Sequence, residues 1–220
     1  MRTFFTTLIV LLISLPLFSK TQENLHGAYR VMAGDTTHLA LFINGYSSFI
    51  SFDDKAYYNT YGGHIQLKGA DIHLTLTYDQ QDPERIGTTV VLPAAVLKDA
   101  LHIGNLHYAK LPAQEQALDG LWQISAREDG GQMVQIPKRS RHTLKLLVSG
   151  YFQWIAIDPE AKGFYGTGGG TYTFDGHEYQ EKILFFSRDN SRIGNLLKFQ
   201  GTREGNQWKH RGLSSKGDPI

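Results

Sequence analysis

Two ionisable side chains, Glu181 and His210, stand in stretches that are otherwise apolar and aromatic, and His210 shares a strand face with Trp208. A carboxylate and an imidazole that converge in an apolar cavity can orient a ligand through hydrogen bonds. Within reach of a substrate atom they can act as an acid–base pair. Because an unpaired buried carboxylate is costly, we expect Glu181 to pair with His210 or Arg192, or to take up a proton.

The alternation of side chains along a β-strand indicates what surrounds this carboxylate. In the strand expected around it, the same face carries Tyr179, Ile183 and Phe185. Two other interpretations stay open: a satisfied polar pair inside a packed core, or a register that turns Glu181 outward. Together with aromatic residues of neighbouring strands, the predicted ligand-binding residues are Phe152, Trp154, Tyr172, Tyr179, Glu181, Trp208 and His210.

Other specific chemistry lacks support in the sequence. The run Thr167 to Thr171 contains three glycines, but no Gly-Lys-Ser/Thr follows it and the next segment is typical of a strand. We expect a sharp bend or a close backbone approach there. The nine histidines are scattered without metal-ligand spacing, and no Gly-x-Ser-x-Gly elbow occurs. We therefore expect no metal, no cofactor and no catalytic residue, and favour a binding protein over an enzyme.

Composition narrows the class of protein further. The formal net charge is +1, with 22 Lys plus Arg against 21 Asp plus Glu, so a nucleic-acid partner is not expected. Cysteine is absent, which excludes disulfides, thiolate metal ligands and a lipidated cysteine anchor. A hydrophobic content of 41% suffices for a substantial core.

The N-terminus has the pattern of a secretory signal peptide. Arg2 precedes a short apolar run, and Ser19 is suited to precede a cleavage site. We expect a signal peptide over residues 1–19, a mature chain that begins near Lys20, and a secreted or periplasmic location without stable membrane insertion after signal removal. An uncleaved anchor is the alternative. The oligomeric state stays open.

The stretch 141–186 predicts four β-strands, because Val-, Ile-, Tyr- and Phe-rich runs alternate with turn signals. Those signals are Ser149-Gly150, Asp158-Pro159 and Asp175-Gly176. In the second half of the chain we expect strands near 119–127, 142–148, 151–157, 164–167, 171–174, 178–187, 192–200 and 206–211. The loop 188–192 is expected to be a hairpin turn, or alternatively a loop that contacts a ligand.

The two halves of the chain match each other as a repeat of roughly 85–90 residues. Residues 25–31 match 118–124, residues 39–53 match 144–158, and Arg85-Ile86-Gly87 matches Arg192-Ile193-Gly194. The fold class is therefore predicted as all-β, with two tandem antiparallel barrels; one barrel closed from both halves is the alternative. The expected domains are residues 1–19 as signal peptide, 20–111 as repeat one, 112–117 as linker and 118–220 as repeat two.

The repeat also provides an internal control for the predicted site. Glu181 corresponds to Leu74 and His210 to Ile103, so repeat one is apolar at both positions. The second copy is also the more aromatic one, since Trp154 replaces Phe49, Trp208 replaces Leu101, Trp122 replaces Tyr29 and Phe152 replaces Ser47.

The segment Gly120-Leu121-Trp122 resembles the Gly-x-Trp signature of lipocalins. With LKLL, GYFQWIAIDP, GTGGGTYTFDGHEY and FFSRDNSRIG, it is similar to the lipocalin-like (calycin) domain of unknown function in exported "membrane or secreted" bacterial proteins. The resemblance implies a calycin-type barrel in each half and an exported protein. Members of that family usually continue into one more strand beyond the Gly-Asp-Pro stretch.

The sequence thus predicts an exported lipocalin-like protein that binds a small apolar or amphipathic ligand in its second barrel. The expected partner is a small hydrophobic molecule held by convergent polar groups in a concave apolar site. The alternative is a non-catalytic envelope or interaction protein with solid barrels, which binds through its outer surface.

Overall fold

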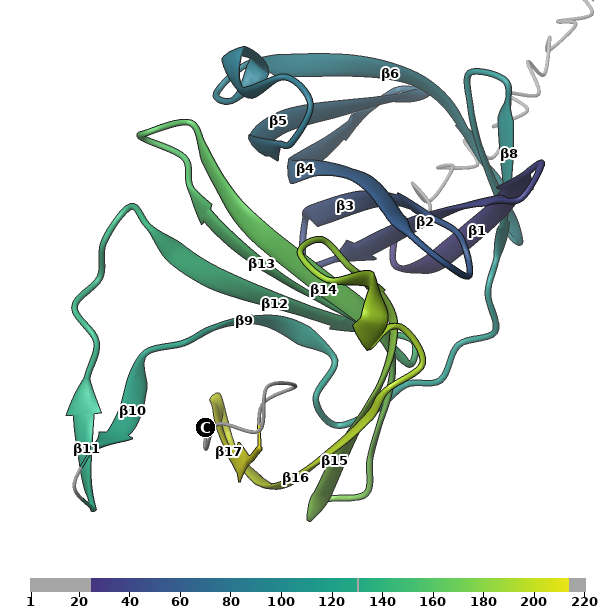
Figure 1. Cartoon of the computed structure of the whole chain (residues 1–220). Helices are drawn as coiled ribbons and strands as arrows, with labels where there is room; N and C mark the ends of the chain where they lie inside the picture. Colours follow the sequence, from purple (N-terminus) through teal and green to yellow (C-terminus); the bar gives the residue numbers. More distant parts are fainter. Residues whose placement is uncertain (1–24, 130, 214–220) are drawn as a thin grey trace, which may run out of the picture.

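The computed structural model describes residues 25–129 and 131–213, and this part of the chain is built almost entirely of antiparallel β-strands (Figure 1). The all-β class with two barrel-like units is confirmed. The signal peptide expected over residues 1–19 lies outside the described residues. Within them, no helix has the length and apolar character needed to cross a membrane.

The first unit is a closed barrel of the strands β1 to β8, in sequence order. It closes where Tyr29 of β1 pairs with Lys110 of β8, so one half of the chain suffices and the alternative of a single barrel from both halves is wrong. Its strands are β1 Gly27–Ala33, β2 Thr36–Ile43, β3 Tyr46–Phe52, β4 Tyr57–Lys68, β5 Asp71–Asp79, β6 Thr89–Val96, β7 Ala100–Ile103 and β8 Leu106–Lys110, with the 3-10 turn η1 Pro83–Arg85.

The second unit is a curled seven-stranded sheet of order β17-β16-β15-β14-β13-β12-β9, beside the barrel in Figure 1. Its edge strands β9 and β17 are not paired with each other in the described part, so this sheet is open there. A separate hairpin, β10–β11, is inserted after β9. The strands are β9 Gly120–Gln123, β10 Ala126–Asp129, β11 Gln132–Gln135, β12 His142–Val148, β13 Tyr151–Asp158, β14 Gly163–Phe174, β15 Glu178–Phe186, β16 Leu196–Glu204 and β17 Gln207–Gly212, with the 3-10 turn η2 Asn190–Arg192.

The four strands and three turns expected over 141–186 are confirmed as β12 to β15, with one correction. Residues 164–167 and 171–174 belong to one continuous strand, β14. The glycines between them allow a close backbone approach: a Cβ at Gly170 would lie 1.9 Å from the carbonyl oxygen of Lys182. The expected hairpin turn at 188–192 is confirmed as η2, in which the Asp189 carboxylate accepts a hydrogen bond from the Ser191 N–H.

A β-bulge accompanies the close approach in both units. The register shifts between Gly169 and Gly170 where β14 pairs with β15, and between Gly62 and Gly63 where β4 pairs with β5. A bulge adds one residue and reverses which side chains face inward beyond it. The predicted sharing of a face by Glu181 and Phe185 is therefore wrong, because Leu184 is the extra residue between them.

Phe185 lies instead in the junction between the units, where the outer face of the barrel packs on the convex face of the second sheet. The ring centre of Phe185 is 6.1 Å from that of Tyr57 in the first unit. The counterpart of Phe185 is Tyr78 and the counterpart of Tyr57 is Phe164, and the rings of this second pair are 6.5 Å apart. The same contact thus occurs twice, as at an approximate twofold axis. Gln153 Nε2 lies at its centre and donates to the hydroxyls of Thr60 and Thr167.

Candidate functional site

The concave face of the second sheet carries a continuous apolar and aromatic layer, here called the aromatic face. Strands β12 to β17 contribute alternate residues to it, because each places every second side chain on this side. Five predicted site residues, Phe152, Trp154, Tyr172, Tyr179 and Trp208, lie in it. The whole face consists of Leu118, Leu147, Phe152, Tyr172, Tyr179, Ile183 and Phe199, flanked by Trp122, Trp154, Phe174, Phe186, Leu197 and Trp208.

Glu181 is buried on this side, with 4% of its surface exposed, so the outward register is wrong. Its Oε1 atom accepts hydrogen bonds from the ammonium of Lys145 and from the hydroxyl of Tyr179, the latter at 2.8 Å. The expected partners were His210 and Arg192, but the cation that meets the carboxylate is Lys145. Burial, reinforced by the Glu181 charge, raises the pKa of Tyr179 well above its usual value, so the phenol keeps its proton and donates.

Lys145 is held in place by its neighbours in the sheet. It pairs with Trp122 on β9 and with Trp154 on β13. Its ammonium lies 4.8 Å from the ring centre of Tyr179 and 5.3 Å from that of Trp208, distances at which a cation is attracted to an aromatic face. The charge is therefore enclosed by one carboxylate and several rings.

The sequence contained a signal for Lys145 that was not used. In the LKLL run of β12, Leu144 and Leu146 pack into the junction, so strand alternation turns Lys145 to the concave side together with Leu147. The residue that matches Lys145 in the first barrel is Ala40, which lies in the barrel interior. Ala40 pairs with Tyr29 and Phe49, the counterparts of Trp122 and Trp154.

His210 and Trp208 form the wall of the site on β17. Their rings stack with centres 4.6 Å apart, and each also contacts Tyr179, at 6.2 Å and 4.9 Å. Burial and, to a smaller extent, the charge of Lys145 lower the pKa of His210 to about 3, so the imidazole is neutral at neutral pH. The Nδ1 atom of His210 and the Nε1 atom of Trp208 are buried and have no hydrogen-bond partner among the described residues.

The segment that leads into β9 anchors the opposite side of the face. Asp119 accepts a hydrogen bond from the hydroxyl of Tyr172, and Gln116 bonds to the backbone of Tyr172 and Phe174. Trp122 donates its indole N–H to the Leu118 carbonyl at 2.8 Å and contacts Trp208 at 5.7 Å. The indole of Trp122 is thus satisfied internally, unlike that of Trp208.

Trp154 lies toward the other end of the face, where its ring meets Phe186 at 5.4 Å. It requires Gly168 beneath it, since a Cβ there would lie 2.7 Å from the indole nitrogen. In residues 25–129 and 131–213, no three His, Asp or Glu side chains are grouped as metal ligands would be.

No protein-family model, curated protein or solved structure matches this chain.

The site therefore combines a large aromatic face, an internally neutralised ion pair and two unpartnered polar atoms. Glu181 and His210 meet through Tyr179 rather than directly. Such an arrangement can hold the apolar body of a molecule against the rings and hydrogen-bond to a polar group on it.

Proposed function

We propose that this protein binds a small amphipathic molecule against the aromatic face of its second unit. One observation carries the proposal: the buried Nε1 atom of Trp208 and the buried Nδ1 atom of His210 lack hydrogen-bond partners in the described part of the chain. Each buried unsatisfied polar atom costs about 1–3 kcal/mol. A ligand that hydrogen-bonds to them recovers this cost.

The charges in the site define the polarity of that ligand. Lys145 and Glu181 already neutralise each other, and the imidazole of His210 is uncharged. A charged ligand group would have to break the ion pair or remain unpaired. The matching ligand is therefore an uncharged molecule with an apolar body and one hydrogen-bonding group, such as a carbonyl or a hydroxyl.

The first unit acts as a structural companion in this proposal. Its interior is filled by apolar side chains, with Leu74 and Leu101 at the positions of Glu181 and Trp208. It also supplies the outer face on which the second sheet packs.

The same proposal includes export and a tandem lipocalin-like origin of the two units. The N-terminal signal pattern supports export. The shared bulge, the two 3-10 turns and the matching strand registers support duplication of one unit, and Gly120-Leu121-Trp122 at the start of β9 supports a lipocalin-like ancestor.

A second candidate is a non-catalytic interaction protein that binds through its outer surface. It is favoured by exposed apolar side chains on and beside the inserted hairpin β10–β11. Ile124 and Met133 are each 57% exposed, and Val134 and Ile136 lie nearby in the sequence at 43% and 40%. Scattered exposed apolar residues are ordinary, but a group on one inserted element is typical of a contact surface.

The test uses the uncharged fluorescent probe 6-propionyl-2-(dimethylamino)naphthalene, which has an apolar ring system and one carbonyl. We expect the wild-type chain to bind it, with quenching of tryptophan fluorescence. Trp208→Leu with His210→Ile converts the wall to the residues of the first unit and keeps the ion pair; we expect its affinity to fall by at least about tenfold, the equivalent of one hydrogen bond.

A matched control changes the hairpin instead, as Met133→Ser with Val134→Thr, and should bind the probe like the wild type. Circular dichroism checks that all three chains are folded. Equal binding by the three proteins, or no binding by the wild type, would contradict the proposal. Native mass spectrometry of gently purified protein then gives the mass of any natural ligand.

A further inference from the structure

The ion pair of the aromatic face places a primary amine among aromatic rings. The rings around the Lys145 ammonium, by distance to the ring centre, are Tyr179 at 4.8 Å, Trp208 at 5.3 Å and Phe152 at 5.4 Å. A hydrogen bond to the Glu181 carboxylate completes this environment. The side chain of Lys145 keeps 17% of its surface exposed, against 5% for Glu181, so the amine belongs to the more accessible member of the pair.

An amine in this environment can form a covalent bond with one class of ligand. Lysine amines react with aldehydes to give imines, and lysines that carry out this chemistry in proteins stand in apolar surroundings. The reaction needs an unprotonated amine, so a neighbouring group must take a proton from the ammonium. The Glu181 carboxylate is in contact with it. Both hydrogen bonds described for Glu181 end on its Oε1 atom, which leaves Oε2 to exchange a proton.

We propose that the aromatic face captures an apolar aldehyde as a protonated imine on Lys145. This capture rests on the function proposed above, because the aldehyde must first lie against the rings as an uncharged carbonyl ligand. The nitrogen of Lys145 attacks the carbonyl carbon and forms the C–N bond after one proton has moved to Glu181.

The reaction balances without a further reactant. Glu181 takes two protons in turn from the nitrogen and passes each to the carbonyl oxygen. The C–O bond then breaks, its electron pair leaves with the oxygen as water, and the electron pair of the nitrogen forms the C=N bond. The nitrogen keeps one proton and the positive charge, and nothing is oxidised or reduced.

The charges of the site favour this product. The cation on the nitrogen is conserved, so it remains paired with Glu181 and continues to face the rings. A ligand that brought its own charge would have to break the same pair. The apolar rings also keep water away from the imine, which slows its hydrolysis.

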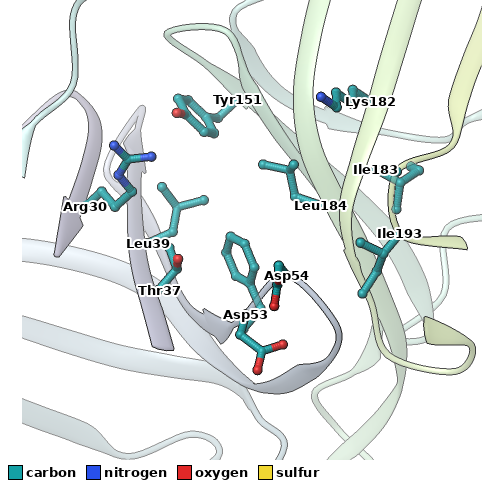
Figure 2. Close-up of a pocket in the computed structure, with 12 residues that line it drawn as sticks. Arg30, Thr37, Leu39, Asp53, Asp54, Tyr151, Lys182, Ile183, Leu184 and Ile193 are labelled. Carbon is teal, nitrogen blue, oxygen red and sulfur yellow. The ribbon is translucent and has the colours of Figure 1, made fainter. Parts of the chain in front are cut away.

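Two other lysines have only one part of this environment each. Lys198 pairs with Glu178 at 3.5 Å, but both side chains are exposed. Lys182 lines a hollow of about 380 Å³ at the junction of the units, beside apolar residues such as Leu184 (Figure 2). Lys182 is exposed and has no ion-pair partner within the described ranges. Neither combines apolar surroundings with a carboxylate as Lys145 does, so both are internal controls.

The test uses 6-(dimethylamino)-2-naphthaldehyde, an aldehyde with the ring system of the ketone probe described above. Sodium cyanoborohydride reduces a protonated imine to a stable secondary amine, and peptide mass spectrometry then locates the label. We expect Lys145 to be labelled at least about tenfold more than Lys182 or Lys198, because binding to the rings raises the local concentration of the aldehyde. Before reduction, the bound aldehyde should absorb at a longer wavelength than the free aldehyde, as a conjugated protonated imine does.

The variant Lys145→Arg keeps a cation beside Glu181 and removes the reactive amine. Its long-wavelength absorbance should fall by at least about tenfold. Lys145→Ala with Glu181→Leu also lacks the amine and should behave in the same way. Lys198→Arg is the matched control and should leave the labelling of Lys145 unchanged. Circular dichroism checks that each chain is folded.

Labelling of Lys145 that does not exceed that of Lys182 and Lys198 would overturn the proposal. So would long-wavelength absorbance that is absent from the wild type or persists in Lys145→Arg. The ketone probe separates this result from the function proposed above. Binding of the ketone without labelling of Lys145 contradicts only the covalent capture, whereas the absence of both contradicts both proposals.

Discussion

The interiors of the two units differ at a few matched positions on the same set of strands. In the closed barrel Ala40 and Leu74 lie inside; in the open sheet the residues at these positions are Lys145 and Glu181. The cross-strand neighbours match as well, because Leu74 pairs with Ile65 and Val90 where Glu181 pairs with Tyr172 and Leu197. The backbone framework is shared, and the chemistry of the interior is not.

The difference shows how a charged group can be accommodated in an apolar interior. A buried carboxylate or ammonium alone is strongly unfavourable, whereas a hydrogen-bonded pair is tolerated. The second unit has both partners, and Tyr179 in place of Ile72 adds a second hydrogen bond to the Glu181 carboxylate. These positions therefore depend on one another energetically, which single and double substitutions can test.

The largest effect on stability is expected when only one member of the Lys145–Glu181 pair is replaced by the matching residue of the first unit. Lys145→Ala leaves Glu181 buried without its cation and should lower the free energy of unfolding by about 3–5 kcal/mol. Lys145→Ala with Glu181→Leu rewrites the pair as Ala40 and Leu74 and should regain most of that loss. Urea denaturation at pH 7 measures both.

Lys198→Ala is the control for this experiment, because Lys198 and Glu178 form an exposed pair at 3.5 Å. We expect it to change the stability by less than about 1 kcal/mol. A double variant as unstable as Lys145→Ala would show that the two positions do not compensate.

A smaller effect is expected at the bulge, which the units share. Gly63→Ala and Gly170→Ala each place a Cβ about 2 Å from a backbone oxygen, and we expect a similar loss of about 3 kcal/mol from each. Gly69 lies on the turn between β4 and β5 rather than at a bulge, with φ +63° and open space around it, so Gly69→Ala should cost about 1 kcal/mol. Thermal unfolding ranks the three, and a tolerated Gly170→Ala would refute equivalence of the bulges.

The smallest effect concerns stability at acidic pH. It depends on His210, which can take up a proton, whereas its counterpart Ile103 in the first unit cannot. The pKa of His210 is lowered to about 3 in the folded chain against about 6.5 when unfolded, so the unfolded state binds more protons between these values. Stability from this group is complete above pH 6.5 and falls as the pH decreases toward 3. Between pH 7 and pH 5 the wild type should lose about 2 kcal/mol more than His210→Ile.

Urea midpoints at the two pH values measure this difference. Identical losses for the wild type and His210→Ile would mean that the imidazole titrates normally and is open to water. Trp208→Leu offers a further comparison, since it removes the stacked ring and keeps the titrating group.

Sequence patterns determined much of the fold. Turns at Ser149-Gly150 and Asp175-Gly176 and the alternation of β12, β13 and β15 were predictable, because turn residues and period-two patterns act locally. The inserted hairpin β10–β11 was missed, since its side chains are mostly exposed and show no buried face with a period of two.

The candidate site was only partly predictable for a physical reason. The aromatic residues were found because they are bulky and share strand faces. Phe185 was assigned to the wrong face because a bulge depends on contact between two strands, which no single strand encodes. The partner of Glu181 was missed because Lys145 is far away in sequence and approaches only when the sheet curls.

The polar centre of the junction has a consequence for how this protein can vary. In an assembly of two identical chains, every residue near a twofold axis meets its own copy, and any substitution there occurs twice. Here a single Gln153 serves both threonines, while its counterpart is Ser48, which bonds to Tyr78 at 2.6 Å. Two glutamines would compete for the same space. Because both halves belong to one polypeptide, a large residue on one side can be matched by a small one on the other, an asymmetric solution that no homodimer can adopt.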